Sequence, residues 1–87
     1  RMNDEQILAR CYMLGRAAFE RGLPENQPGA SVDERLREFY DAVLKDRDLG
    51  FRLDAMDNWH AGWQAAAKEA SEEAEYEAQF PIGTRHL

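Results

Sequence analysis

The sequence predicts an all-α fold, a small bundle of about three helices that span approximately residues 4–22, 32–45 and 52–79. Apolar residues recur three and four positions apart through each of these segments, which is the period of an α-helix. No segment shows strict apolar alternation between hairpin turns, and β-branched residues are scarce. A chain of 87 residues can bury one modest core, so we expect a single helical domain over 1–87.

The first helix is predicted from the residues at its two ends as well as from the helical spacing of its apolar residues. Asn3 is followed three residues later by Gln6, the pattern in which the two side chains satisfy free backbone N–H groups of the first turn. Gly22 suits the position just after a helix, and Pro24 prevents the helix from resuming. We therefore expect the helix to end near Arg21. Residues 23–30, which contain two prolines and a glycine, are expected to form a shaped loop.

The second helix is predicted to begin with another capping box, formed by Ser31 and Glu34. Behind it runs an apolar stripe at helical spacing, made of Leu36, Phe39, Tyr40, Val43 and Leu44. The stripe carries the helix to about residue 45, and residues 46–50 resemble a short break.

The third helix is expected to start at a cap provided by Asp48 or by Asp54, and the sequence leaves that choice open. Alanine and glutamate are dense in this segment and favour a helix intrinsically. Pro81 ends the helix, and residues 81–87 are expected to form a loosely ordered tail. Arg1 is expected to be a cloning remnant ahead of a natural start at Met2.

The tryptophan stretch of the third segment supplies the principal packing face. Trp59, Gly62, Trp63 and Ala66 share one side of a helix, and the glycine leaves a notch for another backbone. An exposed recognition face is the alternative interpretation. The predicted core consists of Gly15, Ala18, Gly22, Leu36, Phe39, Trp59, Gly62, Trp63 and Ala66. If the second-helix stripe and the tryptophan face cannot both be covered, a homodimer would bury them.

Two motifs together resemble a known family. The first is Tyr12-x-x-Gly15-x-x-Ala18-x-x-x-Gly22-x-x-x-Asn26-x-Pro28, and the second is Trp59-x-x-Gly62-Trp63-x-x-Ala66. In this order they resemble the ribosome modulation factor family, over residues 9–28 and 56–67, with an additional helix between them. The resemblance implies a two-helix core in which Gly15, Ala18 and Gly22 pack against the tryptophan helix. It also implies binding to the small ribosomal subunit and the promotion of inactive ribosome dimers.

Charge separates the candidate function classes. Eleven Lys and Arg against seventeen Asp and Glu give a net charge of −6, so direct nucleic-acid binding is not expected. The chain has one cysteine, no secretory leader and no apolar run long enough to cross a membrane, which favours a cytoplasmic protein that does not insert into membranes.

Motifs for catalysis, metal binding and cofactor binding are absent from the sequence. The two histidines, His60 and His86, lack a paired nucleophile, although His60 has Asp57 and Gln64 within hydrogen-bonding reach on a helix. Residues 46–50 lack the further acidic ligands of a calcium loop. Cys11 lies on the apolar stripe and is expected to be buried. We therefore expect no enzyme, no metal and no cofactor.

Acidic residues concentrate in the third helix. The predicted partner-binding face consists of Asp54, Asp57, Glu69, Glu72, Glu73 and Glu77. One interpretation is a solvated surface that only aids solubility. The other is a negative surface that imitates nucleic-acid phosphates. On the second interpretation, the chain is a small acidic inhibitor that occupies the basic site of a nucleic-acid-binding partner, as phage-encoded anti-CRISPR proteins do. The alternative is a diverged ribosome-binding protein related to ribosome modulation factor.

Overall fold

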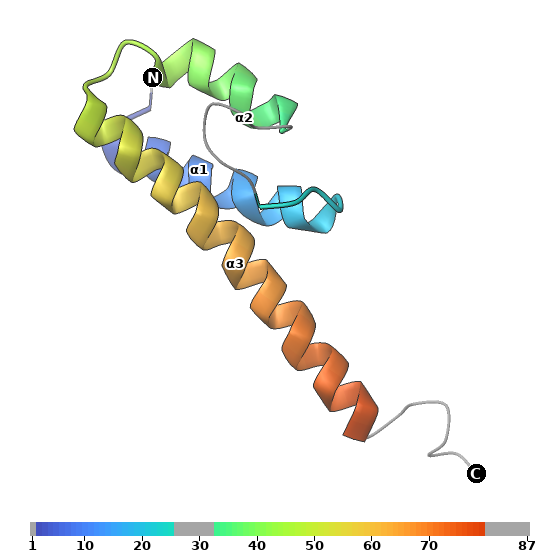
Figure 1. The fold of residues 1–87 in the computed structure, drawn as a ribbon. Coiled ribbons are helices and arrows are strands. Elements are labelled where there is room, and N and C mark those ends of the chain that lie inside the picture. The colour runs from blue at the N-terminus through green and yellow to red at the C-terminus, as the bar shows by residue number, and fades with distance from the viewer. Residues whose placement is uncertain (1, 26–32, 80–87) are drawn as a thin grey trace.

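The computed structural model describes residues 2–25 and 33–79, and these residues form three α-helices and no strand (Figure 1). The helices are α1 (Asp4–Glu20), α2 (Glu34–Phe39) and α3 (Leu49–Gln79), and a π-helical turn, η1 (Tyr40–Leu44), continues α2. The predicted all-α fold of about three helices is confirmed. The expected tail at 81–87 and the loop at 26–32 lie outside the described residues.

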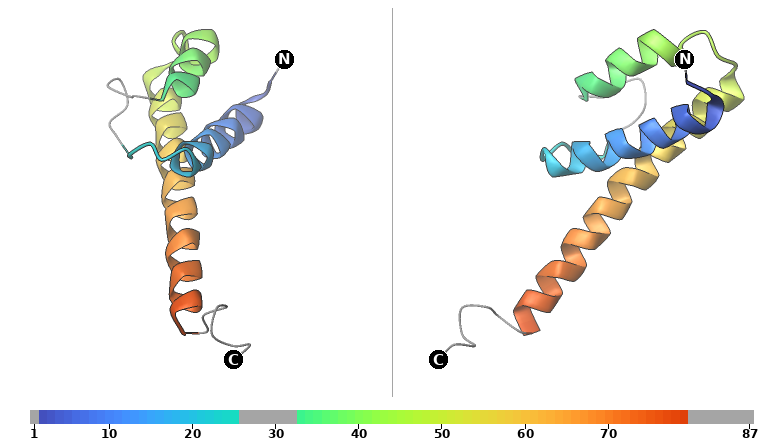
Figure 2. Two further views of the ribbon diagram at one scale, coloured as in Figure 1. Left: turned by 90° about the vertical axis from the view of Figure 1, so that its right-hand side faces the viewer. Right: turned by 180° about the vertical axis from the view of Figure 1, so that it is seen from behind.

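The arrangement divides α3 into two halves. α1 packs against its N-terminal half and crosses it at a steep angle, and α2 lies next to α1 at the same end of the molecule (Figure 2). The C-terminal half of α3 continues past them as a single rod (Figure 1). We call the three-helix part the body, and we call residues 68–78, all of which are exposed, the arm.

The capping residues of α1 are the predicted ones, but the helix ends two residues before the predicted boundary. Gln6 donates its backbone N–H to Asn3 Oδ1 at 2.8 Å, and Asn3 donates its own to Gln6 Oε1 at 2.9 Å, which completes the capping box. The helix ends at Glu20 rather than at residue 22. Gly22 has φ of 80°, a value that glycine adopts without strain. The N–H groups of Gly22 and Leu23 donate to the carbonyl groups of Phe19 and Ala18, both at 2.9 Å.

The expected start of the second helix is wrong. Asp33, not Ser31, is the N-cap: its carboxylate accepts the backbone N–H of Arg35 at 3.1 Å, so the helix starts at Glu34 rather than at residue 32. Near the C-terminal end, the N–H of Lys45 donates to the carbonyl of Tyr40, five residues back, which widens the last turn into η1.

The start of α3 resolves the choice between two caps. Asp48 Oδ1 accepts the backbone N–H of Phe51 at 2.8 Å, so Asp48 caps the helix. The helix consequently begins at Leu49, three residues before the predicted residue 52.

Two glycines mark the crossing of α1 and α3. A Cβ atom on Gly15 would overlap the backbone carbonyl of Trp59, and one on Gly62 would overlap the backbone carbonyl of Tyr12. Each helix therefore offers a glycine to the other helix's main chain. The notch that the sequence predicts at Gly62 is thus filled by another backbone, as expected. Gly15 meets backbone as well, at Trp59.

The core lies on both sides of this crossing. Its buried members come from every helix and include Ile7, Cys11, Leu14, Ala18, Leu36, Leu44, Ala55, Met56 and Trp59. Of the residues expected in the core, Gly15, Gly62 and Ala66 are also buried, whereas Phe39 and Trp63 are partly buried. Gly22 is exposed and is not a core residue, because its role is to end α1. Burial raises the pKa of the Cys11 thiol to about 11.

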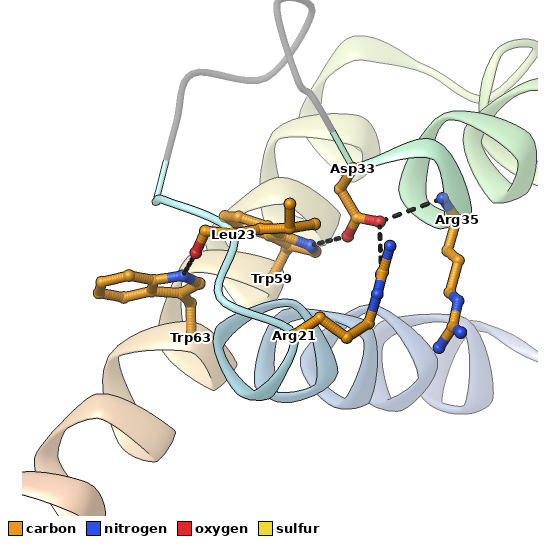
Figure 3. A network of polar contacts seen from close by, with 6 residues as sticks. All are labelled: Arg21, Leu23, Asp33, Arg35, Trp59 and Trp63. Carbon is orange, nitrogen blue, oxygen red and sulfur yellow. Dashed lines mark hydrogen bonds and ion pairs between the residues drawn. The ribbon is translucent and has the colours of Figure 1, made fainter.

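A buried carboxylate ties the three helices together (Figure 3). Asp33 is 1% exposed, and Trp59 donates its indole N–H to Asp33 Oδ2 at 3.0 Å. Arg21, just after α1, contacts Asp33 Oδ1 at 3.3 Å. Trp63 donates its own indole N–H to the carbonyl of Leu23 at 2.9 Å. Both tryptophans thus place their polar atoms on the segments that leave α1 and enter α2.

The second-helix stripe and the tryptophan face contribute to one core. Leu36 is 4% exposed and Trp59 is 1% exposed, and both belong to one cluster, against which Phe39, Tyr40 and Val43 pack while partly exposed. The homodimer stays a prediction.

Replacement of either crossing glycine by alanine is predicted to destabilise the protein. Gly15→Ala or Gly62→Ala should lower the free energy of unfolding by about 1–3 kcal/mol, because the new methyl group meets backbone and forces the helices apart. Urea unfolding followed by circular dichroism measures this loss.

Gly50→Ala is the matched control, because the nearest atom to its added Cβ is Asp48 Oδ1 at 3.7 Å. We expect the control to stay within about 1 kcal/mol of the wild type. Equal stability of all three variants would contradict the close crossing.

Candidate functional site

The arm is the most distinctive surface of the described chain. From Lys68 to Ala78 every residue is exposed, and the arm carries one lysine against five glutamates. The helix is favoured here by composition alone, since alanine and glutamate are strong helix formers. The arm therefore presents acidic side chains around a rod that the other helices do not cover.

Glu69 differs from the other acids of the arm. Its two carboxylate oxygens accept hydrogen bonds from Arg16 Nη1 and Nη2 on α1, both at 2.9 Å. This two-bond pairing and the positive charge of Arg16 lower the pKa of Glu69. Because Glu69 already faces an arginine of its own chain, it is less available to a partner than the sequence predicts.

The remaining acids of the predicted face fall into two groups. Glu72, Glu73 and Glu77 are exposed on the arm, where residues 73 and 77 share one side, about 6 Å apart along the axis. Asp54 and Asp57 are exposed on the half of α3 that belongs to the body. Fifteen positions separate residues 57 and 72, which corresponds to about 22 Å of helix. The six acids thus do not form one continuous face.

A second polar cluster joins α3 to the segment after α1. Glu25 Oε2 lies 3.1 Å from His60 Nδ1 and accepts a hydrogen bond from Gln64 Nε2 at 2.9 Å. The sequence places Gln64 beside His60 but does not identify Glu25, because 35 residues separate it from His60. The histidine ring also stands edge-on to Trp59, with ring centroids 5.1 Å apart.

Several site types are absent from residues 2–25 and 33–79. No group of three or more His, Cys, Asp or Glu side chains is arranged to hold a metal ion. No helix in these ranges combines the length and the apolar character that crossing a membrane requires, and this includes the 31-residue α3.

Sequence reasoning missed two pairings that position α3. Asp33 looked like part of a capping box, and nothing local shows that its carboxylate also accepts the N–H of Trp59. A buried indole N–H needs an acceptor, so the presence of a partner could be expected but not its identity. Arg16 and Glu69 lie 53 residues apart, and only the crossing of the helices brings them together.

Comparisons of this chain with protein-family models, with curated proteins and with solved structures give no match.

Titration of Glu69 tests the contact between the arm and α1. Arg16→Gln is predicted to raise the pKa of Glu69 towards the ordinary value of a glutamate, because both charged hydrogen bonds are lost. Any stability that this pair contributes is present at neutral pH and disappears as acid protonates Glu69. Side-chain carboxyl NMR over a pH series measures the change. Arg10→Gln is the control and should leave Glu69 unaltered, whereas an unaltered Glu69 in Arg16→Gln would show that the pair does not form.

Proposed function

We propose that this protein is a non-catalytic interaction protein whose acidic arm occupies the basic nucleic-acid-binding site of a partner protein. One observation carries the proposal: eleven consecutive residues of α3 are exposed, and they contain five glutamates and one lysine. A rod of this kind can enter a groove that a globular acidic surface cannot. In this proposal the protein inhibits its partner, in the manner of phage-encoded anti-CRISPR proteins, and acts in the cytoplasm.

The charge distribution supports this mode of binding. A concentrated negative field increases the rate of encounter with a basic site, and the effect falls as salt increases. Glu72, Glu73 and Glu77 make no ion pair with any described residue, so binding breaks no internal pair of theirs. Glu69 would instead act by holding the base of the arm against α1 through Arg16.

The body supports the proposal by giving the arm a fixed direction. The arm is a direct continuation of the helix that carries Trp59, Gly62 and Trp63, and these residues fix that helix in the core. A helix that is already formed loses less conformational entropy on binding than a disordered acidic tail would lose. The proposed surface is therefore pre-organised.

Reversal of the arm's charge is predicted to abolish partner binding. Glu72→Lys, Glu73→Lys and Glu77→Lys combined should eliminate the salt-sensitive capture of a basic nucleic-acid-binding protein from a lysate of the source cell. Affinity capture with a salt gradient, followed by mass spectrometry, measures this. Nucleic acid added to the captured complex should displace the protein, because both compete for one site.

The control combines Glu20→Lys, Asp41→Lys and Asp46→Lys, which are exposed acids of the body and of its connection to α3. Both triple variants have the same net charge, so retention of binding by the control assigns the effect to the arm. Equal capture by the wild type and the arm variant would contradict the proposal, and the acidic arm would then be a solubilising surface.

A ribosome-associated role is the second candidate, and the crossing of α1 and α3 favours it. The resemblance to ribosome modulation factor implies that Gly15, Ala18 and Gly22 pack against the tryptophan helix. Gly15 meets the backbone of Trp59 and Ala18 is buried in the same cluster as Trp59, whereas Gly22 is exposed. The same capture experiment discriminates between the candidates. Recovery of ribosomal proteins, unchanged by the arm variant, would favour this role and replace the first proposal.

A further inference from the structure

A hollow between α1 and α2 lies apart from the arm. Arg10 and Leu14 line it from α1, and Arg35, Glu38 and Phe39 line it from α2. Its volume is about 390 Å³. This volume lies within the range typical of small-molecule sites, roughly 300–1,000 Å³.

The two arginines of this hollow are exposed, and among the described residues neither has a carboxylate partner. Within residues 2–25 and 33–79, neither the Arg10 nor the Arg35 guanidinium makes an ion pair or a hydrogen bond. Arg16 on α1 pairs with Glu69, and Arg47 in the turn before α3 pairs with Asp4 at 2.8 Å, whereas Arg37 on α2 makes no ion pair with a described residue. In a chain of net charge −6, two unpaired cations at one hollow leave a local positive field.

The walls of the hollow combine this charge with apolar surface. Leu14 is only 8% exposed, and Phe39 is partly buried against the core. Guanidinium groups bind carboxylate, phosphate and sulfonate groups through paired hydrogen bonds. Glu38 also lines the hollow and reduces the positive field, so the site suits a single anionic group rather than a polyanion.

The Asp33 network holds one side of the hollow in place. Arg35 follows Asp33 by two residues and donates its backbone N–H to that carboxylate. Asp33 is in turn fixed by Trp59 and Arg21. Figure 3 shows the Arg35 side chain extending from α2 towards α1. The backbone of Arg35 is therefore already fixed, which reduces the conformational entropy that its side chain loses when it binds a ligand.

We propose that the hollow between α1 and α2 binds a small organic anion, with its anionic group on Arg10 and Arg35 and an apolar body against Leu14 and Phe39. This site is distinct from the arm. The inference does not depend on the proposed function, because no residue of 68–78 lines the hollow.

The test uses 1-anilinonaphthalene-8-sulfonate, an aromatic sulfonate whose fluorescence rises in apolar surroundings. The folded wild type should bind it saturably at one site. Arg10→Gln and Arg35→Gln should each weaken binding about tenfold, the effect of losing one charged hydrogen-bonding partner. In amide NMR spectra, the probe should shift the signals of Leu14 and Phe39.

Arg37→Gln is the matched control. Arg37 lies on α2, is exposed, and lines a separate hollow with Glu34, Glu38 and Asp41. Its replacement removes the same charge from the same helix and should change the affinity by less than about twofold. Circular dichroism of each variant verifies folding, and the NMR shifts in the wild type test the site independently of any variant. Absence of saturable binding, equal weakening by Arg37→Gln, or shifts elsewhere on the protein would overturn the proposal.

Discussion

The contact of α1 with α3 through Gly15 and Gly62 sets the positions of the other elements. Because each glycine admits the other helix's main chain, the two backbones meet at a fixed point along both helices. This point places Trp59 beside the start of α2, where Asp33 accepts its indole N–H. It also places Trp63 beside Leu23, whose carbonyl accepts the second indole N–H. The position of α2 is thus a consequence of the α1–α3 crossing.

The same constraint explains why part of α3 is uncovered. The 31 residues of α3 extend about 46 Å, whereas the 17 residues of α1 extend about 26 Å and cross α3 at an angle. The crossing is near the middle of α3, so most of the arm extends past α1 (Figure 1). The ion pair of Arg16 with Glu69 joins α1 to the base of the arm. The proposed functional surface is therefore the part of α3 that the body is too short to cover.

The helices and much of the packing could be predicted from the sequence, because these depend on local spacing. Asn3 with Gln6, Gly22 after α1 and the period of Trp59, Gly62 and Trp63 all act over a few residues. Asp33 as the second N-cap was missed because Ser31 with Glu34 offers a similar local pattern. The acidic face was predicted as one surface, but only the structure separates Asp54 and Asp57 from the arm and pairs Glu69 with Arg16. Such pairings join residues 26 to 53 positions apart, which local patterns do not encode.

Amide hydrogen exchange along α3 would show whether the arm is uncovered in solution. If the core fixes only the first half of α3, amides at 55–66 should exchange at rates set by global unfolding. Amides at 70–79 should exchange far faster, because an isolated helical segment of this length opens readily. A tenfold or greater difference in protection factor, roughly 1.4 kcal/mol, is predicted between the two halves. Uniform protection along the whole helix would show that another surface covers the arm, and the account of a free acidic rod would be wrong.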